Sequence, residues 1–238
     1  MSLFREPDFE RACSVMRGDE VLPAAFTPFA NAFEREFIAR PLAVGLEVIG
    51  PGSSFPRLGV RVWIEGEAVI RHLRSTGEDY VDFMPRLRSV APGMFAGTTE
   101  PAGLAPHVRH GGIDAAELAR LPQQVSFWDF EPAAAERVRA ALSADDLQRW
   151  GESLGLGDEL WCVTSMGGAA PVVFVQTAEH AAQLRGPETL EAWRDSYFEL
   201  ARANDEFNCL SPGSCRVEVD SRETFETRYG SSWYEYWH

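Results

Sequence analysis

The chain has 238 residues, of which 45% are hydrophobic, and 36 Asp and Glu residues against 22 basic residues give it a net charge of −14. This composition is typical of a soluble globular protein that buries a core without help from disulfides or metals. All 22 basic residues are Arg, which excludes Schiff-base lysines and lysine-containing phosphate loops, and the negative charge disfavours binding to nucleic acids and to anionic membrane surfaces.

The first half of the chain is expected to combine helices with one β-hairpin. Thr27-Pro28, followed by phenylalanines at helical spacing, predicts a helix that ends at Pro41. Apolar, β-branched runs at 42–49 and 57–64, separated by a turn rich in Gly, Pro and Ser, predict the hairpin. Shorter helices are expected at 8–17, 68–74, 80–87 and 114–121.

A long loop is expected at 91–112, where glycines and prolines alternate. Loops of this length in compact domains are often functional or disordered, so we expect this loop to be the most mobile internal segment. A strand at 125–130 follows it, and then a helix at 132–142 and a second helix that Ser143 caps.

The second half of the chain is expected to contain another hairpin, at 160–165 and 172–176, with Gly167-Gly168 in its turn. Its continuous Val and Phe runs predict strands that are buried on both faces. The longest helical pattern covers 188–207, and a short strand is expected at 216–219. Shorter helices, capped by Thr177 and Ser221, are expected at 177–186 and 221–229.

This order of elements predicts an α+β fold in which helices pack on antiparallel hairpins. Each half holds one hairpin with flanking helices, so the chain is divided into an N-terminal lobe at 1–150 and a C-terminal lobe at 151–238. The linker is expected within 143–158, where glycines cluster. Two lobes of one unit and two independent domains both fit the sequence.

Two histidines in the long loop are the best candidates for a metal site. His107 and His110 lie three residues apart, and Asp114 follows four residues later. Imidazoles beside a carboxylate are common ligands of divalent metals, and a bound metal could activate water for hydrolysis. Two histidines in a glycine-rich loop are more often solvated, and ligation needs oriented partners around the ligands. We therefore expect no metal or other cofactor, and we keep the metal-assisted hydrolase as the alternative.

Two other groups of residues are candidates for binding a protein. Glu191, Asp195 and Glu199 follow one another at four-residue steps on the longest predicted helix, although a solvated face with arginines nearby is the interpretation that we favour. Four large aromatic residues stand in the last six positions, where chain ends are normally polar. They either dock on the core of the chain, which we favour, or form a contact with a partner. These residues are Trp233, Tyr234, Tyr236 and Trp237.

The four cysteines are too scattered for a disulfide framework, and a buried Cys162 beside Trp161 is expected to have a raised pKa and to be inert. Cys209 and Cys215 flank a turn, where they form either a disulfide or redox couple or, as we favour, two small apolar contacts. No apolar run is long enough to span a membrane, and the charged residues at 1–8 do not resemble a signal peptide. We therefore expect a cytoplasmic protein.

The sequence contains no nucleophile elbow and no glycine-rich dinucleotide-binding motif. Together with the negative charge and the aromatic C-terminus, this favours a protein that binds a basic protein partner, as inhibitors and immunity proteins do. The sequence leaves open whether the chain also catalyses a reaction and in which oligomeric state it exists.

Overall fold

The computed structural model describes residues 7–37, 39–49, 57–65 and 123–238. The chain divides into two compact units, Met1–Glu131 and Pro132–His238. The helices expected at 68–74, 80–87 and 114–121, and the loop expected at 91–112, lie outside the described residues. Within the described ranges, every helix is too short or too polar to cross a bilayer.

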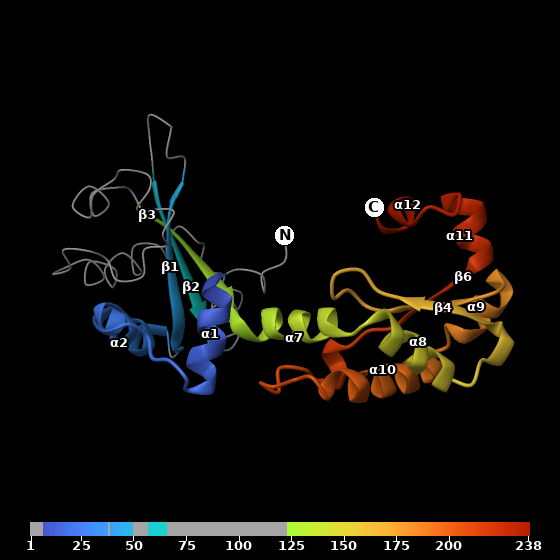
Figure 1. The fold of residues 1–238 in the computed structure, drawn as a ribbon, viewed down its shortest axis with the longest axis horizontal. Helices are drawn as coiled ribbons and strands as arrows, with labels where there is room; N and C mark the ends of the chain where they lie inside the picture. Colours follow the sequence, from blue (N-terminus) through green and yellow to red (C-terminus); the bar gives the residue numbers. More distant parts are fainter. Residues whose placement is uncertain (1–6, 38, 50–56, 66–122) are drawn as a thin grey trace. The chain divides into compact units, whose positions relative to one another are not determined.

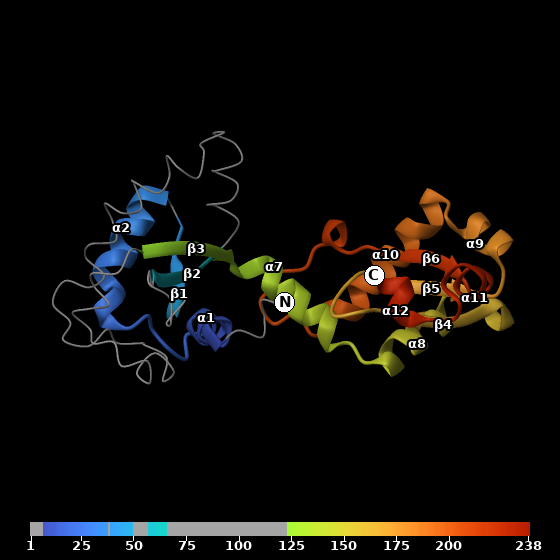
Figure 2. The ribbon, with the colours of Figure 1, turned by 90° about the horizontal axis from the view of Figure 1, so that it is seen from above.

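The first unit is built on a three-stranded sheet in which β2 lies between β1 and β3 (Figure 1). The predicted hairpin is confirmed, because β1 and β2 pair antiparallel, and β3 adds to β2 in parallel. Figures 1 and 2 show α1 and α2 flanking this sheet. The described elements are α1 (Pro7–Arg17), η2 (Ala24–Phe26), α2 (Thr27–Phe37), β1 (Pro41–Ile49), β2 (Arg57–Ile64) and β3 (Gln123–Asp129).

Helix α1 is held on the sheet by an aromatic contact and an ion pair. The Phe9 ring lies 5.1 Å from the Trp63 ring between centroids. Asp8 lies 3.8 Å from the Arg61 guanidinium, directly over Gly45. A Cβ atom at Gly45 would overlap the Asp8 carboxylate, so only glycine allows this close approach of helix and strand.

The second unit is built on another three-stranded sheet, with β5 between β4 and β6. Strands β4 and β5 form the second predicted hairpin, and β6 pairs with β5 in parallel. Helix α7 begins at Phe130 in the first unit and continues into the second. The elements are α7 (Phe130–Ala141), α8 (Ala144–Ser153), η4 (Gly157–Glu159), β4 (Leu160–Thr164), β5 (Val172–Val175), α9 (Ala178–Leu184), α10 (Pro187–Arg202), η5 (Pro212–Ser214), β6 (Glu218–Ser221), α11 (Arg222–Tyr229) and α12 (Trp233–Trp237).

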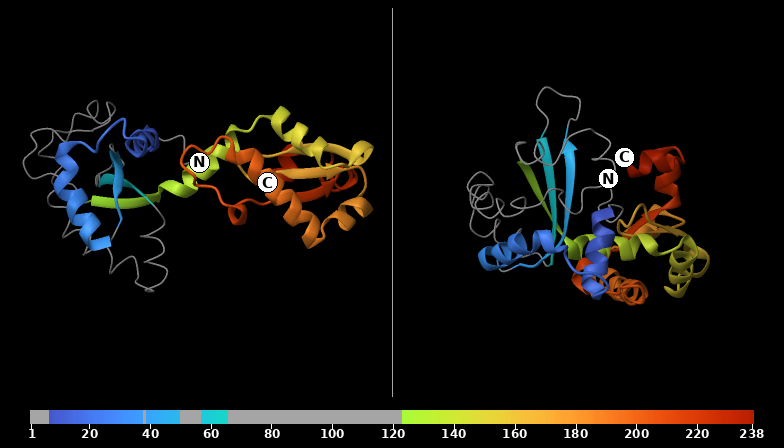
Figure 3. Two further views of the ribbon diagram at one scale, coloured as in Figure 1. Left: turned by 90° about the horizontal axis from the view of Figure 1, so that it is seen from below. Right: turned by 60° about the vertical axis from the view of Figure 1, so that its left-hand side comes forward.

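Helices cover both faces of this second sheet, which confirms that β5 is buried on both sides. Val173 and Val175 belong to a core that also contains Trp193 and Tyr197 of α10. Val172 and Phe174 belong to a second cluster on the opposite face, with residues of α11 and α12. In Figures 1 and 3, α8 and α10 lie on one side of the sheet, and α11 and α12 lie on the other.

Side chains cover a backbone group on each outer strand of this sheet. On β4, the Val163 amide donates to Gln148 Oε1 at 3.3 Å. On β6, the Val219 carbonyl accepts from Arg185 at 3.0 Å. Exposed strand edges tend to pair with other chains, and these two contacts reduce the number of free edge groups.

The longest helix is shorter than the sequence predicts. Helix α10 ends at Arg202, whereas the predicted helix extends to 207. The buried Asp205 carboxylate accepts hydrogen bonds from the backbone amides of Cys209 at 3.0 Å and Leu210 at 2.7 Å. An aspartate that bonds to nearby backbone amides competes with helix formation, so the chain turns here instead.

The last strand is displaced by two residues from the predicted 216–219. In the structure, Glu218 pairs with Val172 and Ser221 pairs with Val175. The position of β5 sets this register, and the local pattern of β6 does not contain that information. The α+β class is confirmed, whereas both sheets are mixed because their third strands run parallel to a hairpin strand. The division at 150/151 into two domains stays a prediction.

Candidate functional site

The aromatic C-terminus packs on the outer face of the second sheet. The Trp233 ring lies 4.2 Å from the Phe225 ring and stacks on Trp161 at 6.0 Å, with 10° between the planes. Tyr236 and Trp237 pack against the same cluster. The docking that we favoured is therefore present for three of the four residues.

Part of this aromatic segment nevertheless remains exposed. The Trp233 side chain keeps 39% of its surface accessible, and Tyr234 keeps 68%. The Tyr234 ring stacks on His238 at 4.5 Å, and the Arg222 guanidinium lies 5.6 Å above the Trp161 ring. We call Trp161, Arg222, Trp233 and Tyr234 the aromatic platform. It combines large rings with a cation, as many protein interfaces do.

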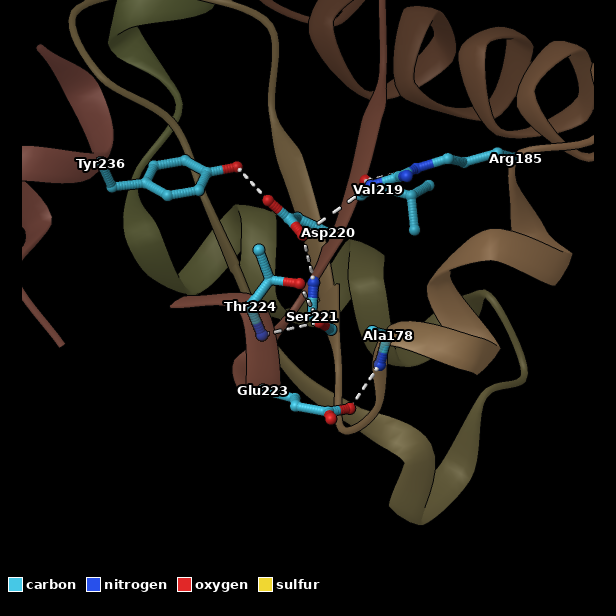
Figure 4. A network of polar contacts seen from close by, with 8 residues as sticks. All are labelled: Ala178, Arg185, Val219, Asp220, Ser221, Glu223, Thr224 and Tyr236. Carbon is cyan, nitrogen blue, oxygen red and sulfur yellow. Dashed lines mark hydrogen bonds and ion pairs between the residues drawn. The ribbon is translucent and has the colours of Figure 1, made fainter. Parts of the chain in front are cut away.

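A polar network attaches α12 to the sheet (Figure 4). Tyr236 Oη donates to Asp220 Oδ2 at 3.1 Å, and the Ser221 amide donates to Asp220 Oδ1 at 2.8 Å. Arg185 approaches the same carboxylate at 3.7 Å from the other side. Figure 4 shows Tyr236 and Arg185 pointing toward Asp220 from opposite directions. The single carboxylate therefore links α12, β6 and the end of α9.

The beginning of α11 is held by a neighbouring set of bonds. The Thr224 amide donates to Ser221 Oγ at 3.0 Å, which confirms Ser221 as the cap of this helix. The Ala178 amide, at the start of α9, donates to Glu223 Oε2 at 2.9 Å. These contacts fix α11, the helix that carries Arg222, and they therefore stabilise the position of this residue in the aromatic platform.

The environment of Tyr236 keeps its hydroxyl protonated. Burial raises the pKa of Tyr236, and the negative charge of Asp220 and the bond to it raise this pKa further. The hydroxyl is therefore a permanent donor at neutral pH. A neutral, tethered tyrosine of this kind acts as a structural link and not as a proton carrier near pH 7.

The predicted acidic row on α10 is largely paired. Asp195 lies 2.9 Å from Arg194, and Glu199 lies 2.8 Å from Arg202. Glu191 borders a groove beside α10. The pattern thus consists of surface ion pairs with one carboxylate turned to the groove, and its role in binding stays a prediction.

All four cysteines are free thiols. Burial raises the pKa of the half-buried Cys162 to about 11, as its predicted position in an apolar strand implied. Burial also raises the pKa of Cys215, which is fully buried. Both thiols are protonated at neutral pH and are therefore poor nucleophiles.

His107, His110 and Asp114 lie outside the described residues. Among the residues that the structure does describe, no group of three or more His, Cys, Asp or Glu side chains could hold a metal ion. The metal-assisted hydrolase stays a prediction.

Comparisons with protein-family models, with curated proteins and with solved structures return no match. Function must therefore be argued from the site itself.

Sequence reasoning identified the aromatic residues but not the residues that support them. Asp220, Arg185 and Arg222 were not candidates, because their importance depends on which strand they lie on and on what faces them. One sequence signal was present. Arg216, Glu218 and Asp220 alternate with Val217 and Val219, which indicates a strand with one charged face.

Proposed function

We propose that the chain binds another protein through the aromatic platform, and that the partner is basic. The observation that carries the proposal is the exposure of Trp233 and Tyr234 on a helix that is fixed to the sheet. Large rings held in one orientation lose little conformational entropy when a partner covers them, which is why Trp and Tyr are frequent at interface hot spots.

The charge of the second unit supports a basic partner. This unit contains 18 Asp and Glu residues against nine arginines. Ion pairs occupy several of the arginines, whereas Glu235 on α12 is exposed beside the platform. An excess of negative charge around an apolar contact surface accelerates association with a positively charged protein, as in inhibitor and immunity complexes.

The experiment is photo-crosslinking in cells. A photoreactive phenylalanine analogue is placed at Tyr234, and a matched control carries it at Gln183, which is exposed on α9. We expect one basic protein to be crosslinked at Tyr234 and not at Gln183. No position-specific product, or only acidic products, would reject the proposal.

The crosslinked protein is then purified and titrated with the chain. Trp233→Ala is expected to weaken binding by about 30-fold, the loss typical of a hot-spot aromatic, and Gln183→Ala is expected to leave it unchanged. The association rate should fall as salt is added, because the steering field is screened. An unchanged affinity for Trp233→Ala would contradict the role of the platform.

A further inference from the structure

A groove of about 380 Å³ lies between the first half of α10 and the segment 213–218. Four residues of α10 line it, and their spacing places them on one face of the helix. The volume falls in the range of small-molecule sites. The helix residues are Pro187, Leu190, Glu191 and Arg194.

The floor of the groove is apolar and its rim is charged. Cys215 and Val217 line it with 1% and 9% of their surfaces accessible, and Leu190 contributes from the helix. Glu191 and Arg194 line the helix wall, and Arg216 lines the opposite wall. Glu218 also borders the groove, but its charge acts on Tyr236 of α12, on the other face of the sheet. The rim therefore offers a carboxylate on the helix and a guanidinium on the opposite segment.

Arg216 differs from every other arginine of the second unit. Eight of the nine arginines take part in ion pairs, hydrogen bonds, ring contacts or other electrostatic interactions. Across 132–238, where every residue is described, Arg216 has none of these interactions. In a unit with twice as many carboxylates as arginines, this leaves an exposed guanidinium available to a ligand at the rim of the groove.

We propose that this groove binds a small apolar zwitterion of the amino-acid class. The ligand carboxylate would pair with Arg216, whose planar guanidinium can hold it through two hydrogen bonds. Arg194 is already held by Asp195 at 2.9 Å, so Arg216 is the principal anchor. The ligand ammonium would be held by Glu191, and the apolar side chain would cover Val217.

The mixed charge of the rim is the reason for choosing a zwitterion. A simple anion would meet the repulsion of the Glu191 carboxylate, and a simple cation would meet the repulsion of the Arg216 guanidinium. A ligand that carries both charges satisfies both walls. This inference concerns a site other than the aromatic platform and does not depend on the proposed function.

The test is a titration of the ¹⁵N-labelled full chain with L-phenylalanine, in which binding is measured by NMR from the changes in the backbone amide chemical shifts. We expect saturable shifts at 190–194 and 215–218. Three control ligands each lack one feature: N-acetyl-L-phenylalanine lacks the ammonium, L-phenylalanine methyl ester lacks the carboxylate, and glycine lacks the apolar side chain. Each of them should bind at least about tenfold more weakly than L-phenylalanine. No saturable shift with L-phenylalanine, or equal binding of any of the other three ligands, would overturn the proposal.

Variants assign the anchor. Arg216→Gln is expected to weaken binding of L-phenylalanine by about tenfold or more, because a charge-assisted hydrogen bond is lost. Arg202→Gln is the matched control, since Arg202 is also exposed but does not line the groove. Both substitutions are at the surface, and a thermal melt checks that each variant is folded. Equal affinities of the two variants would reject Arg216 as the anchor and with it the proposal.

Discussion

Gly168 connects the β4–β5 turn to helix α7. Its backbone has a φ of +84°, and a Cβ atom there would lie 2.8 Å from the Glu136 carbonyl oxygen. The Gly168 carbonyl also accepts a hydrogen bond from Arg139 Nε at 2.9 Å. Glycine is thus required twice at this position, for its conformation and for the close approach of the helix.

Two glycine substitutions separate these requirements. Gly167→Ala is expected to cost about 1–2 kcal/mol of unfolding free energy, because Gly167 also has a positive φ but has open space around it. Gly168→Ala should cost about 1–3 kcal/mol more, because the added methyl group presses on α7. Denaturant unfolding of the two variants measures the difference. Equal losses of unfolding free energy would show that α7 moves to accommodate the methyl group at no cost.

Tyr236 contributes to stability through its bond to Asp220. Tyr236→Phe is expected to lower the unfolding free energy by about 1–3 kcal/mol, since the acceptor is charged and partly shielded from water. Tyr234→Phe provides the control, because Tyr234 is largely exposed and should change stability little. A loss that is the same in both variants would mean that the link to Asp220 is not a stabilising contact.

Alkaline pH is expected to destabilise the protein. Burial raises the pKa of Tyr197 to about 12 and that of Cys162 to about 11, and the pKa of Tyr236 is raised as well. In the unfolded chain these groups lose their protons near their ordinary pKa values, about 8.5 for Cys and 10 for Tyr. The unfolded state then binds fewer protons than the folded state, so the stability present at neutral pH declines as pH rises.

The absence of lysine makes this pH dependence simple to interpret. Only Cys and Tyr side chains titrate between about pH 9 and pH 12, because the arginines keep their charge. Thermal melts across this range should show a falling melting temperature, with a shallower decline for Tyr236→Phe. A melting temperature that stays constant up to pH 11 would contradict the raised pKa values.

At the scale of elements, α12 is the least covered helix of the second unit. Although α12 contains no fully buried residue, its rings cover Phe174 and Phe225, which are buried on the outer face of the sheet. The contacts of Trp233 and Tyr236 with Phe174 span 5.4 and 5.2 Å between ring centroids. The helix therefore completes a hydrophobic layer while it also presents part of its surface outward.

Deletion of residues 232–238 tests this double role. We expect a loss of about 2–4 kcal/mol in unfolding free energy and new binding of a hydrophobic dye, since covering a large aromatic side chain contributes about 1.5–3 kcal/mol when burial is complete. Tyr234→Ala should leave the melting temperature nearly unchanged because that ring is mainly exposed. An unchanged melt for the deletion would show that the docking is not stabilising.

At the scale of the whole molecule, the second unit has a core of its own. Buried residues of α7, α8 and α10 pack on one face of its sheet, and α11 covers the other. A unit with its own core and both sheet faces covered has the features of an independently folding domain.

We therefore predict that a fragment of residues 132–238 folds by itself and unfolds in one cooperative transition. Circular dichroism and denaturant unfolding of the fragment measure this. A fragment without a cooperative transition would instead favour two lobes of a single folding unit, the other alternative that the sequence leaves open.

The sequence by itself determined the elements whose signals are local. Both hairpins were predicted from apolar runs around turn residues, and the caps Ser143, Thr177 and Ser221 were recognised from residue type and position. The bonds of a cap join residues three apart, and a hairpin joins strands that are neighbours in the chain. The aromatic end was identified in the same way, from composition alone.

Only the tertiary structure decided how distant segments meet. Strand β3 pairs in parallel with β2, and β6 pairs in parallel with β5. These pairings depend on strand register and on which face a helix covers, as do the bond from Tyr236 to Asp220 and the groove beside Arg216. Many alternative pairings have similar local propensities. The native pairing is selected by the burial of both faces of a sheet at once, which is a property of the assembled core and not of any segment.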